Sequence, residues 1–525
     1  MRILLVTKEM IVYERQALAA LSAVLKLEGH EVRGMVAHPL PDLPGLGTIM
    51  GRMGKLGTKP VVDPMDTTGI PTSVYETVRD FRPDVIGYTM MTGEANYLIT
   101  LNRKLKQHFD FYTVLGGPHT QFYHKSVEED GVDAICIGEG DISFPQFLER
   151  LDTGKDFWLT ETFHVKHEGK IYRNPLGPLV EDLDTLPNPD RQMLYDIDPS
   201  IANLGTKHFF TARGCPYRCS YCFNAKYNDN YKGLGKIGRF RSPERVIQEI
   251  EWTKERYPLD MLAFMEDVFT LKPHGWIQEF TRLYKKRINL PFYSTTRADN
   301  LIEKDLKALA EAGLDYVWMG VETGDEEAAD KVFQRDLDNK TILDACKLLR
   351  KYGVRIYSLN IMGLPVKDQF EVDMRTLDLN MKIKPALASV GLLYPYPGTP
   401  IEEYSIKTGY LDEDIDNAQF LESNKFSSVI KFSSETEKLK VENLQKITGM
   451  VVDFPFLRPF VRFLASLPLT SFYHIFYYLH IGYCYKFRLA PASRKKLFQS
   501  GGALKSMVQE GPIMFKTFLR LVGYS

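Results

Sequence analysis

Between about residues 205 and 425, six apolar runs of strand length each end in a polar or glycine-rich loop. The predicted strands are His208–Ala212, Met261–Met265, Phe292–Thr296, Tyr316–Met319, Arg355–Ile361 and Leu387–Leu392. Segments with helical spacing separate them, and one begins with Ser242 as cap and Pro243 at the first helical position. Such alternation predicts a parallel sheet covered by helices. Six units correspond to a partial TIM-like barrel, whose functional loops lie at the carboxyl ends of the strands.

Three cysteines follow the first of these strands in a C-x3-C-x2-C spacing: Cys215, Cys219 and Cys222. Three thiolates this close can bind three irons of a [4Fe–4S] cluster and leave the fourth iron without a protein ligand. A disulfide would not need a third cysteine. A zinc site usually has a fourth Cys or His at a recognisable spacing, whereas His208 lies seven residues upstream on the predicted strand. The spacing therefore favours an iron–sulfur site at which a small molecule can bind and be reduced.

The cysteine motif resembles that of the radical S-adenosylmethionine (SAM) enzymes, in which the open iron binds SAM and one electron cleaves it to a 5′-deoxyadenosyl radical. Loops after the later strands match further elements of that family in order. The resemblance implies SAM-binding roles for Tyr221, Glu266, Asp267, Arg297, Gly320, Glu322, Asn360 and Gly363. Tyr221 matches the aromatic residue near the adenine, and Glu266 and Asp267 match the family's acidic pair. Taken alone, each acidic residue fits a helix cap or a solvated carboxylate equally well.

Residues 1 to about 150 also alternate between strand and helix. The predicted strands are Ile3–Val6, Glu31–Ala37, Asp84–Thr89, Tyr112–Leu115 and a run near 132–137, and the predicted helices are Ala17–Leu27, Val74–Phe81 and Tyr97–His108. The stretch Pro39–Gly69 is rich in Gly, Pro and Met and is expected to be a loop or an insertion. A doubly wound, Rossmann-like sheet is predicted, with its ligand at the carboxyl ends of the strands.

Three loops at those strand ends resemble the cobalamin (B12)-binding domain that precedes the barrel in one large class of radical SAM enzymes. Small residues in these loops let the nucleotide tail of the cofactor enter between sheet and helix. The resemblance implies cobalamin-binding roles for Thr89, Met90, Thr92, Gly93, Gly116, Gly117, His119, Gly138, Glu139 and Gly140.

The loop Thr7–Tyr13 departs from the D-x-H-x-x-G motif of B12-dependent mutases and methionine synthase, whose His ligates cobalt. We therefore expect cobalt without a His ligand on its lower face, and we interpret His119 as a loop histidine without a metal role. A flavodoxin-like domain without cofactor is the alternative, because glycine pairs are weak signals.

Residues 151–200 are predicted to link the domains 1–150 and 201–425, and the Pro-rich stretch Leu183–Arg191 resembles the family's bridge. The last domain, 426–525, is predicted to be helical, beginning with the amphipathic helix Glu435–Val452. Residues 451–525 are rich in aromatic side chains and carry ten Lys or Arg but only two acidic residues. Pro468 and two histidines interrupt the uncharged run from Phe463 to Tyr485, which argues against a spanning helix. A cap over the barrel mouth and a contact with the membrane surface both stay open.

Composition excludes several classes of protein. The chain has 525 residues and a formal net charge of −1, so no overall field favours nucleic acid as a partner. Half of its six cysteines form one cluster, which is typical of metal binding in a reducing compartment. We expect a cytoplasmic protein, at the inner membrane face if the C-terminus contacts lipid. An apolar small-molecule substrate and an electron donor such as flavodoxin or ferredoxin are the expected partners.

These observations predict a cobalamin-dependent radical SAM enzyme. The preferred interpretation, by resemblance, is methyl transfer to an unactivated carbon of an apolar or amphiphilic substrate through the 5′-deoxyadenosyl radical and methylcobalamin. A non-methylating reaction such as the oxidative ring closure of a tetrapyrrole, as in the anaerobic porphyrin-ester cyclase, is the alternative. A non-catalytic B12 sensor that binds DNA would need a His ligand motif and a basic recognition helix, and the sequence has neither.

Overall fold

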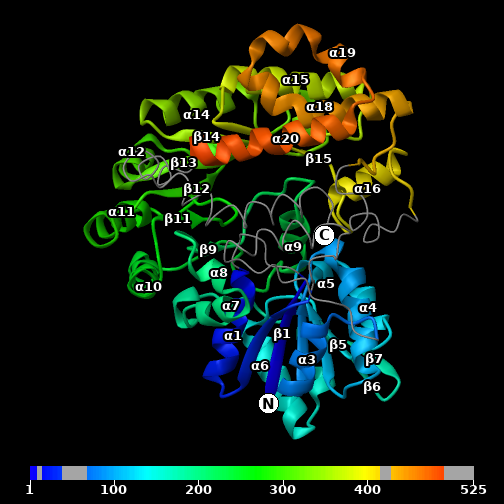
Figure 1. Ribbon diagram of the computed structural model, residues 1–525. Coiled ribbons are helices and arrows are strands. Elements are labelled where there is room, and N and C mark those ends of the chain that lie inside the picture. The colour runs from blue at the N-terminus through cyan, green and yellow to red at the C-terminus, as the bar shows by residue number, and fades with distance from the viewer. Residues whose placement is uncertain (9–14, 38–67, 414–426, 490–525) are drawn as a thin grey trace, which may run out of the picture.

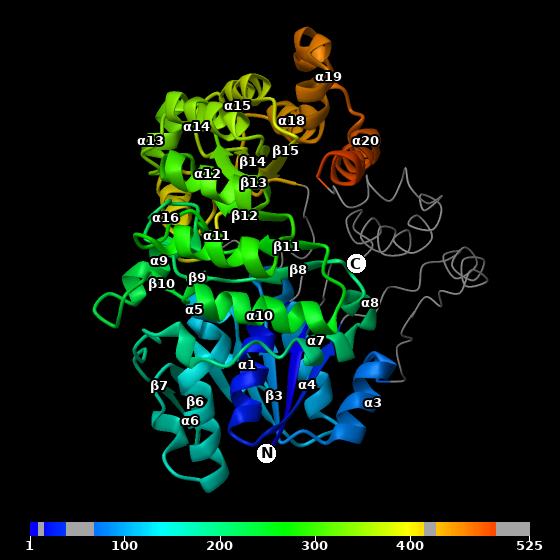
Figure 2. The same ribbon diagram turned by 90° about the vertical axis from the view of Figure 1, so that its left-hand side faces the viewer.

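The computed structural model describes residues 1–8, 15–37, 68–413 and 427–489. The expected loop Pro39–Gly69 therefore lies almost entirely outside the described residues. Two sheets dominate the architecture, and Figure 1 shows the first, in blue and cyan, below the second, in green and yellow. The C-terminal helices, in orange and red, lie beside the upper part of the second sheet. Figure 2 shows the same stacking from the side.

The first sheet has the order β2-β1-β3-β4-β5-β6-β7. Its strands are β1 (Arg2–Thr7), β2 (Glu31–Val36), β3 (Val85–Thr89), β4 (Tyr112–Gly116), β5 (Ala134–Cys136), β6 (Phe163–His167) and β7 (Lys170–Arg173), and its helices include α1 (Gln16–Leu27), α3 (Thr72–Phe81), α4 (Ala95–Lys106), α5 (Pro118–Phe122) and α6 (Gly140–Thr153). The strands from β2 to β5 pair in parallel. Ile3 and Leu5 pack with α1 and α6, whereas Leu4 and Val6 pack with α3 and α4. The predicted sheet with helices on both faces is confirmed.

Part of the segment expected to link the domains extends this sheet instead. β6 pairs antiparallel with β5, and β7 pairs antiparallel with β6. Phe163 and Val165 are buried in the core of the first domain. The hairpin escaped prediction because its strands are short and most of β7 is exposed, so its alternation is weak.

The second sheet has the order β15-β14-β13-β12-β11-β8, with every pair parallel. Its strands are β8 (Thr206–Phe209), β11 (Met261–Phe264), β12 (Phe292–Thr296), β13 (Leu314–Glu322), β14 (Arg355–Met362) and β15 (Leu387–Leu392), and the helices between and after them are α9 (Phe223–Asn230), α10 (Pro243–Arg256), α11 (Trp276–Arg287), α12 (Glu303–Ala312), α13 (Glu326–Lys331), α14 (Asn339–Lys351), α15 (Gln369–Ile383) and α16 (Pro400–Lys407). All six predicted strands are present. β8 and β15 are the two edges, so the barrel is open. The Ser242 hydroxyl accepts the Arg245 backbone N–H at 3.3 Å, as the predicted helix cap requires.

One buried arginine joins the bridge between the domains to the barrel. Arg191 begins α7 (Arg191–Ile197), and its side chain is inaccessible to solvent. Its guanidinium donates to the His208 carbonyl at 2.6 Å and to a Glu249 carboxylate oxygen of α10 at 2.8 Å. It also lies 4.4 Å from the centre of the Phe209 ring. The bridge is therefore anchored by an ion pair without access to water.

The C-terminal region consists of α18 (Glu435–Asp453), a 3-10 turn (Pro455–Phe460), α19 (Val461–Ser466), α20 (Thr470–Cys484) and a terminal turn of π-helix (Tyr485–Leu489). The predicted amphipathic helix is confirmed in α18, whose apolar residues pack on α15 and β15. Cys484 and Leu489, at the end of α20 and beyond it, join a core cluster with Tyr293, Tyr316 and Tyr357 of the barrel strands. Among the described residues, no helix is long and apolar enough to span a bilayer.

Candidate active site

The three cysteines lie in the loop between the short strand β9 (Ala212–Arg213) and α9. β9 pairs antiparallel with β10 (Arg239–Phe240). Gly214 has a φ of +83°, and a Cβ there would lie 2.2 Å from the Ile237 carbonyl oxygen, so this position accepts only glycine. Cys222 caps α9, while Cys215 and Cys219 are buried. The predicted cysteine loop therefore forms a compact turn in which Cys215 and Cys219 are buried and Cys222 is half-buried.

Two hydrogen-bond donors point at these sulfurs. Asn224 donates to Cys222 Sγ at 3.6 Å, and Arg297 donates to Cys219 Sγ at 3.5 Å. Burial raises the pKa of the Cys215 thiol to about 12 and that of Cys222 to about 11, and the nearby Asp267 carboxylate adds to both shifts. Two buried thiols and one half-buried thiol, two of them with N–H donors at their sulfurs, suit a [4Fe–4S] cluster. Iron supplies the positive charge that keeps such thiolates ionised, and N–H···S bonds tune the potential of the cluster.

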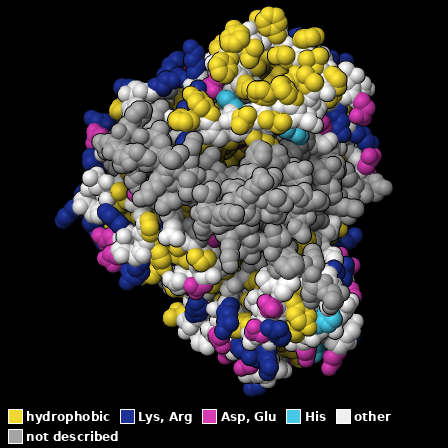
Figure 3. Space-filling view, in the orientation of Figure 1, with side chains coloured by type: hydrophobic (Ala, Val, Ile, Leu, Met, Phe, Trp, Pro, Cys, Tyr) yellow, Lys and Arg dark blue, Asp and Glu magenta, His cyan; other side chains and the backbone are white. Residues whose placement is uncertain are grey.

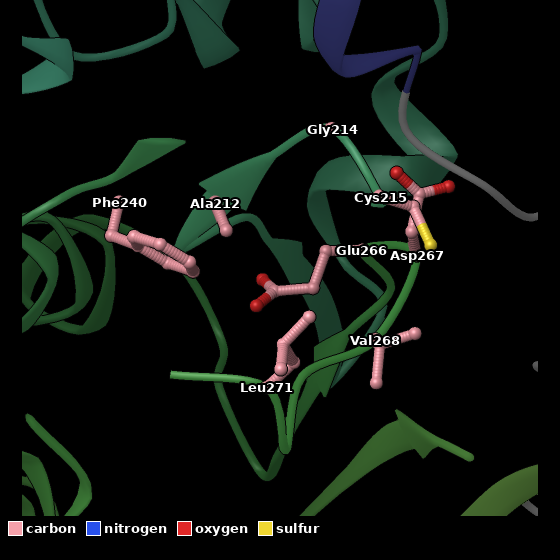
Figure 4. A pocket seen from close by; sticks show the side chains of 8 residues that line it. All are labelled: Ala212, Gly214, Cys215, Phe240, Glu266, Asp267, Val268 and Leu271. Carbon is pink, nitrogen blue, oxygen red and sulfur yellow. The ribbon is translucent and has the colours of Figure 1, made fainter. Parts of the chain in front are cut away.

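The acidic pair divides into two different environments. Glu266 accepts the backbone N–H of Thr211 at 2.7 Å and its hydroxyl at 2.6 Å, and it forms a buried ion pair with Lys272. Asp267 instead accepts from Asn224 at 3.0 Å, and its side chain is exposed. Figure 4 shows Asp267 beside the Cys215 sulfur, while Glu266 points away between Ala212 and Leu271. Glu266 thus fixes the strand that leads to the cysteines, and only Asp267 lies next to them.

Tyr221, Gly320 and Glu322 are brought together by a residue that the sequence did not single out. Arg335 forms an ion pair with Glu322 at 3.0 Å, and it donates to the Tyr221 hydroxyl at 3.1 Å and to the Gly320 carbonyl at 2.5 Å. Arg335 is the one arginine in the loop between α13 and α14, and only its burial distinguishes it.

Backbone strain lies at the same place. Glu322 has a φ of +66°, and the pairing of β13 with β14 shifts register between Gly320 and Glu322. A non-glycine residue with positive φ costs energy and is maintained only where the surroundings enforce it, which is common at functional sites. Burial raises the pKa of Glu322, although Arg335 acts against that shift. The loop therefore presents a partly shielded carboxylate at a fixed position.

The remaining predicted SAM residues divide between two places: Arg297 lies at the cysteine loop, whereas Asn360 and Gly363 contact α15 and β15. Arg297 stacks 4.1 Å from the centre of the Tyr217 ring in the cysteine loop, so it belongs with the cysteines. Asn360 accepts from Asn380 at 2.7 Å and donates to the Ser389 carbonyl at 2.9 Å, which ties β14 to α15 and β15. Gly363 has a φ of +74°, and its N–H donates to Asp373 at 3.0 Å. These hydrogen bonds place Asn360 and Gly363 against α15 and β15 rather than at the cysteine loop.

The predicted cobalamin loops are built mainly from backbone. The Met90 N–H donates to the Gly116 carbonyl at 3.0 Å, and the His119 N–H donates to the Met90 carbonyl at 3.2 Å. Gly117 has a φ of +93°, and a Cβ there would lie 2.8 Å from both the N and the O atom of Met90. The loop that ends β3, with Thr89, and the loop that ends β4 are therefore in direct contact, with no room for side chains at the point where they cross.

The side chain of His119 contacts residues of the same domain through both ring nitrogens. Its Nδ1 lies 3.4 Å from the Thr92 hydroxyl and its Nε2 lies 3.2 Å from the Ser126 hydroxyl. Gly93 lies in the 3-10 turn Thr92–Glu94 that His119 contacts. Both ring nitrogens face hydroxyl groups of the same domain, which agrees with a structural histidine. The loop after β1, where other B12 proteins carry their ligand, lies in part outside the described residues (9–14).

The third loop faces the other domain. Gly138 packs against Tyr231, Glu139 forms ion pairs with Arg239 and Arg213, and Gly140 begins α6 and packs on α1. Nearby, Phe122 of α5 and Phe223 of α9 lie with ring centres 6.2 Å apart. Figures 1 and 2 both show α5 beside α9. The carboxyl ends of the first sheet therefore lie against the cysteine loop of the second.

Comparison with known proteins gives two family matches in the same order. The B12 binding domain family matches residues 58–148, and the Radical SAM superfamily matches residues 209–377. An uncharacterized methyltransferase of Pyrococcus horikoshii is 26% identical over 343 residues, which are 65% of this chain and 73% of that protein. The anaerobic magnesium-protoporphyrin IX monomethyl ester cyclase of Rubrivivax gelatinosus is 27% identical over 351 residues, 64% of this chain and 61% of the cyclase.

The fold also has solved counterparts. A structure of the cobalamin-dependent SAM radical enzyme OxsB, with aqua-cobalamin and SAM bound, aligns with a TM-score of 0.64 at 15% identity and covers 99% of this chain and 80% of OxsB. This likeness concerns the arrangement of the two sheets. The family match to the radical SAM superfamily includes all three cysteines and the loop with Glu322.

Proposed function

We propose that this chain, which belongs to the radical SAM enzymes that carry a B12-binding domain, transfers a methyl group to an unactivated carbon of an apolar or amphiphilic molecule. One observation carries the proposal most directly. The loops that end β4 and β5 meet the loop that holds the cysteines, through Phe122 and Phe223 and through Glu139 and Arg213. A methyl donor on the first sheet and a hydrogen-abstracting centre on the second would therefore share one space.

The chain's own residues hold and shield the groups that react. When bound, the cluster with SAM supplies hydrogen-atom abstraction from carbon, and cobalamin supplies a methyl group. Cys215, Cys219 and Cys222 would hold three irons, with Asn224 and Arg297 donating to their sulfurs. The strained Glu322 and its partner Arg335 would present one carboxylate toward SAM. Cys215, Cys219, Arg297 and Arg335 are buried, which limits the access of water to the reactive centre.

The C-terminal helices support the apolar character of the substrate. The 34 residues from Phe454 to Phe487 contain eleven large hydrophobic side chains that are substantially exposed, including Phe456 at 70%, Phe463 at 64% and Leu479 at 62%. Figure 3 shows hydrophobic side chains gathered at the top of the molecule, over these helices. No acidic residue occurs between Phe454 and Leu489. Exposed aromatic side chains in a segment without acidic residues suit a membrane interface, where an apolar substrate would be found.

Two details limit how much charge this surface contributes. Arg458 pairs with Asp378 at 2.6 Å, and Arg462 pairs with Glu371. Six of the ten basic residues counted in 451–525 lie outside the described residues. Membrane contact through the described part would therefore depend mostly on aromatic burial. At low salt, the protein should float together with vesicles of anionic lipid. The triple variant Phe456→Ser/Phe463→Ser/Leu479→Ser should stay in the lower fraction, unbound. Failure of the unaltered protein to float would make a soluble substrate the better proposal.

The electron would come from an acidic donor such as a flavodoxin or ferredoxin. Pro216 and Arg218 are the exposed residues between Cys215 and Cys219, which makes this edge of the cysteine loop the shortest route to the cluster. Arg218 pairs with Asp229 at the surface. A slower reduction of the cluster in Arg218→Glu, with unchanged reduction by dithionite, would support this route.

The reaction itself is tested by reconstitution. The protein is loaded anaerobically with iron, sulfide, hydroxocobalamin and SAM carrying a deuterated methyl group, then incubated with dithionite as the reductant and a total lipid extract. Methylation predicts S-adenosylhomocysteine, 5′-deoxyadenosine and a deuterated methyl group in a lipid. The alternative, oxidative ring closure as in the cyclase, predicts 5′-deoxyadenosine without S-adenosylhomocysteine. Absence of both products would contradict the proposed function.

A further inference from the structure

The loop Gly138–Gly140 is held in place by the other domain. Arg239 donates two hydrogen bonds to the Glu139 carboxylate, at 2.8 and 2.6 Å, and the Tyr227 hydroxyl donates a third at 2.9 Å. The Glu139 backbone N–H donates to the Tyr231 oxygen at 2.9 Å. All four contacts come from residues of the radical SAM domain. The loop that ends β5 therefore takes its position from the neighbouring domain.

On the radical SAM domain, this contact is made by two arginines, which repel each other and cannot form a hydrogen bond with each other. In the β9–β10 ribbon, Arg239 and Arg213 stand directly opposite one another. Like charges opposite each other in a ribbon are destabilising. Asp141, in the first turn of α6, accepts hydrogen bonds of 2.7 and 3.0 Å from Arg213, and Glu139 accepts from Arg239. Each carboxylate balances the charge of one arginine. With the first domain docked, the Arg239 side chain is only 1% exposed, so the carboxylate rather than water satisfies its charge. The two opposing arginines therefore obtain these carboxylate partners from the first domain.

The contact between the Gly138–Gly140 loop and the second domain also leaves no free space. A Cβ at Gly138 would lie 2.2 Å from the Tyr231 hydroxyl oxygen and 2.8 Å from a Leu176 methyl carbon. The loop therefore approaches the second domain as closely as a backbone can. A shift of the loop would move Tyr231 and Arg239, and a shift of Arg239 would move its ribbon partner Arg213.

This set of contacts joins the two loops that are predicted to bind the cofactors. Arg213 precedes Cys215 by two residues, and Gly138–Gly140 is one of the three loops at the cobalamin end of the first sheet. We propose that Glu139, Asp141, Arg213 and Arg239 form a positioning network that couples cobalamin binding to the environment of the iron–sulfur cluster. If one site affects the other, the coupling is reciprocal, so each cofactor should alter the properties of the other. This inference rests on the two cofactor assignments and does not depend on which group is transferred.

The test measures binding and spectroscopy. In the unaltered protein, cobalamin should shift the electron paramagnetic resonance signal of the reduced cluster. Glu139→Gln should raise the cobalamin Kd, followed by visible absorbance, about tenfold, which lies within the usual range for coupled sites. It should also abolish the cobalamin-induced shift while iron per chain stays unchanged. A merely structural ion pair would change the melting temperature without changing the cluster signal.

A matched control lies at an exposed ion pair of the first domain. Glu128→Gln weakens the pair of Glu128 with Arg173, whose side chains are 51% and 44% exposed, and should leave the cobalamin Kd and the cluster signal as they are. If Glu139→Gln proves unstable, Tyr231→Phe removes only the acceptor of the Glu139 N–H and should give a smaller change of the same kind. Unchanged cobalamin affinity and an unchanged cluster signal in the folded variant would overturn the proposal. Both readouts are independent of methylation, so they are unaffected if the proposed reaction is wrong.

Discussion

The two predicted cofactor sites, one at the strand ends of each sheet, differ in the groups that form them. At the second sheet, the site consists of charged side chains in buried pairs, such as Glu322 with Arg335 and Glu266 with Lys272. At the loops that end β3 and β4 of the first sheet, it consists mainly of backbone and small residues, with Gly117 crossing the Met90 backbone. A site made of side chains can be broken by changing one functional group. A site made of backbone is broken by adding atoms, so each end calls for a different kind of variant.

The largest effect is expected at the cysteines. Changing Cys215, Cys219 and Cys222 to Ala removes every proposed protein ligand of the cluster, and we expect loss of the visible iron–sulfur absorbance and of all SAM cleavage. Iron content and 5′-deoxyadenosine are the measurements. Cobalamin absorbance should remain, because the first sheet keeps its loops. Iron at the unaltered stoichiometry in this variant would contradict the cluster assignment.

The buried pair beside the cysteines should show the next largest effect. Arg335→Met leaves the Glu322 carboxylate buried without its partner, and we expect a loss of about 3–5 kcal/mol in unfolding free energy. Denaturant unfolding measures this loss. Adding Glu322→Gln to the same chain should recover much of that stability but not SAM binding. Arg218→Met, at an exposed pair, is the control and should change stability by less than about 1 kcal/mol.

An added methyl group should break the backbone-built end. Gly117→Ala combines a positive φ with contacts of 2.8 Å to Met90, and we expect it to cost about 1–3 kcal/mol and to weaken cobalamin binding. Gly154 also has a positive φ of 68°, but nothing lies within 4 Å of its Cβ position. Gly154→Ala should therefore cost about 1 kcal/mol through backbone strain alone and leave cobalamin binding unchanged. Equal effects of the two changes would argue against a close crossing at Gly117.

The smallest effect concerns His119. Its two nitrogens face Thr92 and Ser126, so we expect protein-bound Co(II) cobalamin to show no nitrogen superhyperfine splitting. His119→Gln should leave that spectrum as it is. A three-line nitrogen pattern that disappears in the variant would make His119 a cobalt ligand and would reverse the contrast between the two ends.

The same contrast explains what the sequence could predict. All six barrel strands followed from their apolar runs, and the cysteine loop followed from three residue types in one spacing. Asn360 shows the limit, because its position matched a family element while its amide bonds Asn380 and Ser389. Arg335 could not be found, since a lone arginine in a loop is common and only the fold buries it. Glu139 sits in a predicted cofactor loop, yet its carboxylate bonds the other domain, a partner that local sequence does not reveal.

The buried Arg191 gives the molecule an order of assembly. Arg191 is made 58 residues before its partner Glu249. At about 5–20 residues per second, synthesis leaves this guanidinium without its carboxylate for about 3–12 s. An arginine does not enter an apolar interior without a counter-ion, so the bridge has to stay hydrated during that interval. The first domain can complete its own sheet early, but the two halves can lock together only after α10 has left the ribosome.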